Sequence, residues 1–239
     1  MLEKRWTSVS VVVSLPHGGG AIAGVQRRRK VAAKPGGIKL LLNDGVSFAH
    51  GAANALREQA DRMQKCGPPQ VAGLWTLQFD ALNAGFEAIK PQIEASTVEG
   101  DRCVYIFELT DTGAVLTVRE KMTEIVKCKR DKIGDFESYK CISQYNAKSR
   151  NSGVLYVGSS FATENRKATL STRIKQHLGL SNHTTYAMHL AKWASGLQGG
   201  VQITVYQYPD ETDRENVLAI EDYLSRKLDP LLGRRGRAR

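Results

Sequence analysis

The stretch 153–160, Gly-Val-Leu-Tyr-Val-Gly-Ser-Ser, constrains the fold of this chain more than any other stretch. An apolar run that is closed off by a glycine and two serines predicts a strand that leaves the core and turns. Tyr156 lies within this run. We therefore expect Tyr156 near the end of its strand, beside an opening in the core.

The next periodic segment, 170–178, predicts a short amphipathic helix. Arg173 and His177 fall one turn apart on its apolar face, whereas Lys175 falls on the other side. Polar side chains that face a core cost free energy unless they are paired or line a cavity. A snorkelling Arg and a hydrogen-bonded core His are the ordinary explanation, so these two residues do not define a site by themselves.

A third polar residue lies on the apolar stripe of the last predicted helix, 217–228. Glu221 falls inside the arc of Ile220 and Leu224, while Asp222 is expected to point away. A carboxylate in this position is costly unless it meets a cation or a metal ion. Arg173 is one such cation, so the two helices together suggest a shared polar site.

These residues carry a resemblance to a known family. Tyr156-Val157-Gly158 resembles the second half-motif of the GIY-YIG nucleases, and segment 170–177 is similar to the helix that follows it in that family. The resemblance covers about residues 101–236 and rests on an ordered set of four residues: Tyr156, Arg173, His177 and Glu221. It implies an α+β fold with a small, mostly antiparallel sheet flanked by helices.

The first half-motif is less clear in the sequence. Segment 103–109 is β-branched and aromatic and predicts a strand. Within it, Val104-Tyr105 stands where the family has Ile-Tyr, and Cys103 replaces the family's Gly. Tyr145 is the alternative, because it lies only eleven residues before Tyr156. Its neighbourhood is polar and turn-like, so we favour Tyr105.

Choosing Tyr105 requires an insertion, since it lies 51 residues before Tyr156, whereas the family joins its half-motifs by a short hairpin. Segment 118–132 has the Lys, Arg and Glu content of an exposed helix that could form this insertion. Residues 117–150 hold nine Lys or Arg against five Asp or Glu. That modest basic bias suits a segment lying along a nucleic-acid backbone.

Hydrolysis of a phosphodiester requires a base, a cation that stabilises the developing charge, and assistance to the leaving oxygen. Glu221 is the predicted ligand of one divalent metal ion, Mg²⁺ or Mn²⁺, because such ions prefer oxygen. The planar guanidinium of Arg173 suits the non-bridging phosphate oxygens. His177, expected to titrate near neutral pH, and the hydroxyls of Tyr105 and Tyr156 would move protons. The sequence does not say which of them is the base.

Four further residues are predicted to contact the substrate: Ser159, Lys175, Arg234 and Arg235. Family members often carry an Asn shortly after a Pro in the last segment, but this chain has Gly233 there. That difference removes one expected supporting contact and leaves the other site residues unchanged.

The net charge of +10 favours a polyanionic partner, which the resemblance identifies as DNA, most simply double-stranded. Three regions are expected: a basic, disordered arm over 1–45, a helical extension over 46–100 with helices near 46–66 and 74–94, and a nuclease domain over 101–239. A further helix is expected over 184–193. The oligomeric state is left open, with a dimer as one option.

The four cysteines show no Cys-x-x-Cys pair, so a zinc site is not expected and free thiols in the cytoplasm are the simplest interpretation. No stretch approaches the roughly 20 apolar residues of a membrane span. Three hypotheses follow: a metal-dependent DNA endonuclease, for instance in restriction or defence; an inactive or regulatory nucleic-acid-binding protein that keeps the fold; and a structural or ribosome-associated basic protein.

Overall fold

The computed structural model of the chain describes residues 45–84, 91, 102–111, 113–134, 136–150, 153–161, 170–181 and 184–233. The predicted basic arm lies outside these residues, apart from residue 45. The chain divides into two compact units, Met1–Glu58 and Gln59–Arg239. The first unit contributes only the N-terminal part of a helix to the described residues, so the architecture below is that of the second.

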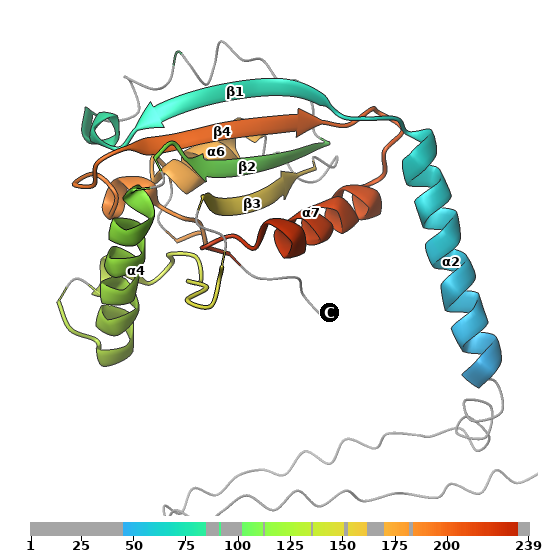
Figure 1. Ribbon diagram of the computed structural model, residues 1–239, viewed down its shortest axis with the longest axis horizontal. Coiled ribbons are helices and arrows are strands. Elements are labelled where there is room, and N and C mark those ends of the chain that lie inside the picture. Colours follow the sequence, from blue (N-terminus) through green and yellow to red (C-terminus); the bar gives the residue numbers. More distant parts are fainter. Residues whose placement is uncertain are drawn as a thin grey trace, which may run out of the picture. The chain divides into compact units, whose positions relative to one another are not determined.

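The described residues form five α-helices, two 3₁₀ helices and four strands (Figure 1). In chain order these are α2 (Gly45–Lys65), β1 (Gln70–Gln78), η1 (Asp80–Ala84), β2 (Cys103–Leu109), α4 (Ala114–Asp131), α5 (Phe136–Tyr139), β3 (Val154–Ser160), α6 (Leu170–Leu178), η2 (Leu190–Lys192), β4 (Gly200–Gln207) and α7 (Arg214–Leu228). No described helix is both long and apolar enough to cross a bilayer.

The four strands form one antiparallel sheet in the order β1-β4-β2-β3. The α+β class and the small antiparallel sheet flanked by helices are thus confirmed. β2 lies in the interior of the sheet, paired with both β3 and β4, whereas β3 lies at an edge. This order places the strand of Tyr105 directly beside the strand of Tyr156.

Two of the predicted helices are wrong. Residues 74–78 belong to β1, which pairs with β4 and so joins the sheet although it lies in the segment expected to be a helical extension. Residues 80–84 of that predicted helix form the short 3₁₀ helix η1, and residues 85–90 lie outside the described residues. In segment 184–193 the only helical residues are those of the short η2. Leu190 and Trp193 are nevertheless buried there. The apolar pattern of this segment therefore predicted correctly that these two residues are buried, but not their secondary structure.

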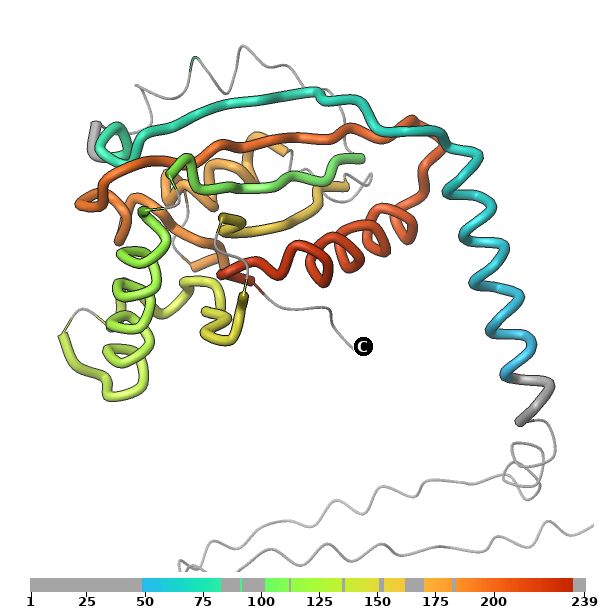
Figure 2. Tube along the Cα trace, in the orientation of Figure 1, coloured from blue at the N-terminus to red at the C-terminus, as the bar shows by residue number. Residues whose placement is uncertain are grey.

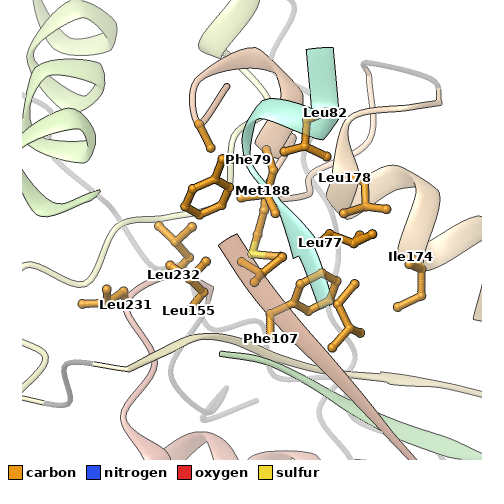
Figure 3. Close-up of a cluster of buried hydrophobic side chains, with 14 of the residues drawn as sticks. Leu77, Phe79, Leu82, Phe107, Leu155, Ile174, Leu178, Met188, Leu231 and Leu232 are labelled. Carbon is orange, nitrogen blue, oxygen red and sulfur yellow. The ribbon is translucent and has the colours of Figure 1, made fainter. Parts of the chain in front are cut away.

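Buried side chains form two clusters, one on each face of the sheet. The larger cluster contains Tyr105 and Phe107 of β2 and the buried residues of α6, and Figure 3 shows part of it around Phe107 and Met188. The smaller cluster contains Val104 and Ile106, the alternate residues of the same strand, and is covered by α7. Because successive residues of a strand point to opposite faces, β2 is the shared centre of both clusters.

The chain between β2 and β3 leaves the sheet as α4 and returns through α5 and the 140–150 segment, as the trace in Figure 2 shows. The Leu109 N–H donates to the Gly153 carbonyl at 2.7 Å and closes this insertion at its base. Val118, Met122 and Ile125 of α4 are buried in the larger cluster. The insertion is therefore packed against the core over one face of its main helix.

Candidate functional site

Two tyrosines lie on the paired strands β2 and β3. Their rings are stacked with centroids 6.4 Å apart and planes 17° apart. In the strand register Tyr105 lies opposite Gly158, and a Cβ at that glycine would come within 2.6 Å of the Tyr105 hydroxyl oxygen. Tyr105 is fully buried, whereas Tyr156 is half-buried. Gly158 is therefore the residue that leaves room for the Tyr105 ring against the neighbouring strand.

His177 lies beneath both tyrosines, because it sits on the buried face of α6. Its ring centroid is 4.3 Å from that of Tyr156 and 5.6 Å from that of Tyr105. The Met188 N–H donates to its Nδ1 at 3.3 Å, so the neutral ring carries its proton on Nε2. Nε2–H then donates to the Tyr105 hydroxyl oxygen at 3.1 Å.

Burial, followed by the nearby charge of Arg173, holds the pKa of His177 well below its ordinary value. The expectation that His177 titrates near neutral pH is therefore wrong for the unliganded protein. A neutral ring with one nitrogen accepting and the other donating is a positioning group for Tyr105.

Arg173 lies one turn before His177 on α6. Its Nη1 donates to Gln176 Oε1 at 2.7 Å. Burial acts to lower the pKa of Arg173, but the tyrosines and Glu221 together raise it above its ordinary value. The site thus holds a permanent cation whose planar group is partly fixed before any ligand binds.

Glu221 of α7 is half-buried beside the edge strand β3. The Ser159 hydroxyl donates to its Oε2 at 2.5 Å. Ser159, predicted to contact the substrate, therefore contacts the predicted metal ligand. Burial, followed by the charge of Glu221, raises the pKa of Tyr156 to about 12. Burial likewise raises the pKa of Tyr105 far above its ordinary value, so both phenols are protonated at neutral pH.

Tyr156, Arg173 and Glu221 line one cleft of about 880 Å³. The other described residues in its lining are Met122, Ile125, Val126, Lys129, Ile142, Ser143, Gln144, Tyr145, Val157, Tyr186, Leu218, Ala219, Asp222 and Gly233. Tyr105 and His177 are not among them and lie behind Tyr156. Among the predicted catalytic residues, three thus face the cleft and two support them from the core.

The alternative first-motif residue, Tyr145, also lines the cleft. It forms an antiparallel bridge with Leu232 and does not lie on the strand paired with β3. The position predicted to be Asn in the family, Gly233, has φ of 105°, and a Cβ there would lie 3.0 Å from Tyr156 Cε2. Asn146 instead donates from Nδ2 to the carbonyls of Pro230 and Gly233 at 2.9 and 3.2 Å.

The remaining predicted site residues are placed as follows. Lys175 lies on α6, half-buried, and is not part of the described cleft lining. Arg234 and Arg235 lie outside the described residues. Asp222, expected to point away, lines the cleft beside Glu221.

Lys129 is a cleft residue that the sequence reasoning missed. It lies four residues after Ile125 and seven after Met122, so it falls on the apolar stripe of α4. The same test that singled out Glu221, a charge on an apolar stripe, would have found it. Tyr186 gave no such indication, because its place in the cleft depends on the irregular segment before η2.

The residues present fit a divalent metal ion that uses one or two protein carboxylates. The described residues contain no group of three or more His, Cys, Asp or Glu side chains arranged to hold a metal. Mg²⁺, however, keeps several waters and is commonly bound through one or two carboxylates together with substrate phosphate oxygens. Glu221 and its neighbour Asp222 both line the cleft and offer suitable oxygen ligands.

Comparisons of the chain with protein-family models, with curated proteins and with solved structures found no match. The assignment of function therefore depends on the cleft itself.

Proposed function

We propose that this chain is a metal-dependent endonuclease that hydrolyses phosphodiester bonds of DNA, with a GIY-YIG-like domain. The observation that carries the proposal is the convergence of Tyr156, Arg173 and Glu221 on one cleft, from a strand and two different helices. A fixed cation, a carboxylate and a phenol side by side are the groups that phosphodiester hydrolysis needs. A role in restriction or defence, in the cytoplasm, is consistent with this activity.

In the proposed mechanism, Arg173 binds the non-bridging oxygens of the scissile phosphate and stabilises the charge that develops on them. Glu221, with Asp222 beside it, would hold Mg²⁺ or Mn²⁺, which supplies Lewis-acid stabilisation and a more acidic bound water. Ser159 keeps the Glu221 carboxylate in place through its hydrogen bond to Oε2.

Tyr156 is the tyrosine that faces the substrate, and its hydroxyl is placed to exchange a proton there. The charge of Glu221 helps to raise its pKa. Any cation that compensates this charge therefore lowers the pKa and makes proton transfer from Tyr156 easier. Tyr105 and His177 lie behind Tyr156, and their ring contacts with it and the hydrogen bond between them hold the Tyr156 ring in place.

Cleavage of supercoiled plasmid DNA in Mg²⁺ or Mn²⁺ tests the proposal, with Arg173→Ala as the decisive variant. We expect this variant to lose cleavage and to keep most of its DNA binding, because the chain's many other Lys and Arg supply the phosphate contacts that dominate affinity. Lys127→Ala, which removes an exposed cation outside the cleft lining, is the matched control and should cut normally. Near-normal turnover in Arg173→Ala would refute the assignment.

The second candidate is a non-catalytic nucleic-acid-binding protein with the same fold. It is favoured by the Ser159–Glu221 hydrogen bond, which occupies one carboxylate oxygen, and by Cys103 and Gly233 at positions where the family has other residues. DNA binding that weakens steeply with salt, without cleavage under any divalent metal, would support this candidate.

A further inference from the structure

The cleft has a second wall, formed by α4 and the two short segments next to it. Lys129 lines the cleft from α4, and its Nζ donates to the Ile142 carbonyl at 3.2 Å. Ile142 forms a parallel bridge with Ala187, supported by the Ser143 N–H donating to the Ala187 carbonyl at 2.8 Å. The residue before Ala187 is Tyr186, which also lines the cleft. Lys129 and Tyr186 are thus joined through one small hydrogen-bonded framework.

The charged residues of the cleft lining come from different helices. Among the described residues of the cleft lining, the cations are Lys129 and Arg173, and the two carboxylates, Glu221 and Asp222, both come from α7. Lys129 is half-buried, so its ammonium group is partly shielded from water and burial lowers its pKa. An anion that enters the cleft would offer this cation the ionic contacts that burial from water denies it. The ammonium has three N–H donors, so it can bind the anion and keep its hydrogen bond to the Ile142 carbonyl.

Tyr186 is 61% exposed although it is a large aromatic residue. The similarly exposed Tyr223 lies under Lys227 Nζ, 5.7 Å from its ring centroid, and lines a different, smaller pocket. An exposed aromatic ring and a cation on the same cleft wall form a combination that suits a nucleic-acid strand, because the ring packs on bases or sugars and the cation contacts phosphates.

We propose that Lys129 and Tyr186 form a strand-binding subsite on the second wall, in which Lys129 contacts a backbone phosphate and Tyr186 packs against a base or sugar of the same strand. The inference rests on the proposed function, because it requires a nucleic acid in the cleft. It gives the insertion between β2 and β3 a substrate-binding role and sets the strand on a wall whose described lining residues include no carboxylate.

The test is equilibrium binding of the full chain to a fluorescent DNA duplex and to a single-stranded oligonucleotide, by anisotropy in EDTA over a series of salt concentrations. Lys129→Gln should reduce the slope of log K against log salt by about 0.9 for the duplex or about 0.7 for the single strand, the value of one lost phosphate contact. Lys129→Arg should keep the wild-type slope. Lys127→Gln, on an exposed position of the same helix outside the cleft lining, is the matched control and should change neither the slope nor the plasmid cleavage rate.

Tyr186→Ala should weaken binding about tenfold without changing the slope, and Tyr223→Ala is its control. A larger loss on the single strand supports stacking on an unpaired base, and an equal loss on both supports packing on the sugar. Because Tyr186 is exposed, its variant tests the subsite even if Lys129→Gln fails to fold.

The inference is overturned if folded Lys129→Gln has the wild-type affinity and the wild-type slope of log K against log salt, and Tyr186→Ala also has the wild-type affinity. The proposed function fails separately. A wild-type chain that cuts plasmid DNA while both variants bind normally refutes only the subsite. A wild-type chain that binds DNA without cutting it refutes the endonuclease proposal, and the binding measurements on the variants still test the subsite. A wild-type chain that does neither refutes both.

Discussion

Replacing Gly158 by Ala places a methyl group where the Tyr105 ring now lies. The added Cβ would be 2.6 Å from the Tyr105 hydroxyl oxygen and 2.7 Å from its Cε2 and Cζ atoms. Contacts this short require the ring to move, but Tyr105 is fully buried, stacked on Tyr156 and in edge contact with Phe107. The ring therefore has little room to move without disturbing its hydrogen bond with His177.

Overpacking of this kind typically costs ~1–3 kcal/mol. For a unit of this size, 1 kcal/mol shifts the melting temperature by about 2–4 °C, so we expect Gly158→Ala to melt about 2–12 °C lower than the wild type. Urea unfolding followed by circular dichroism gives the free energy directly, and plasmid cleavage measured well below the melting temperature reports on the site. Cleavage should fall further than stability explains, because the shift displaces Tyr105 and with it the Tyr156 ring stacked on it.

Gly153→Ala is the matched control, because a Cβ at Gly153 has no neighbour within 4 Å. It precedes the same strand and should change stability by no more than about 0.5 kcal/mol. If Gly158→Ala were as stable as the wild type, or if both substitutions cost the same, the close contact between β3 and the Tyr105 ring would not be a real constraint.

Three other predictions concern individual side chains. Tyr105→Phe should stay folded and lower the cleavage rate by up to about 10²-fold, the scale of a misplaced site residue, because Tyr105 positions the Tyr156 ring from behind the cleft. Tyr145→Phe should lower the rate less, and full activity in both variants would remove the first half-motif from the mechanism. Glu221→Gln should be inactive and should lose any rise in melting temperature with Mg²⁺, so a variant that still cuts DNA would place the metal elsewhere. Because burial holds the pKa of His177 below its ordinary value of 6.5, the unfolded chain takes up a proton below that pH that the folded chain does not. The free energy of unfolding should therefore drop as pH falls below about 6.5, by up to about 1.4 kcal/mol per pH unit. In His177→Gln the free energy of unfolding, measured with urea at each pH, should depend less steeply on pH.

The sequence located the elements that carry the site. The predicted strand 103–109 and helix 170–178 agree with β2 and α6, because the β-branched and aromatic run of the first and the helical apolar stripe of the second are also the faces that the tertiary structure buries. The inward position of Glu221 was predicted from the cost of a charge on an apolar stripe, and the side chain is half-buried at the cleft.

Other features could not be read from local patterns. In residues 74–78 of β1 the spacing of Leu74 and Leu77 predicts a helix, whereas their strand conformation depends on pairing with the distant β4. Whether a histidine is charged depends on tertiary burial, so the pKa of His177 was not predictable from its residue type. Tyr186 reaches the cleft through the Ile142–Ala187 bridge, a contact between segments that carry no regular pattern.

The hydrogen bond between Leu109 and Gly153 that closes the insertion has a consequence for folding. Bringing β2 and β3 together requires closure of the whole 110–152 loop, which costs ~2 kcal/mol more in chain entropy than closing a four-residue hairpin. The strand pair that stacks Tyr105 on Tyr156 is therefore a non-local pairing and is expected to be slow to form. A partly folded or newly synthesised chain in which α4 has formed but β3 has not yet joined the sheet would have one wall of the cleft and no stacked tyrosine pair.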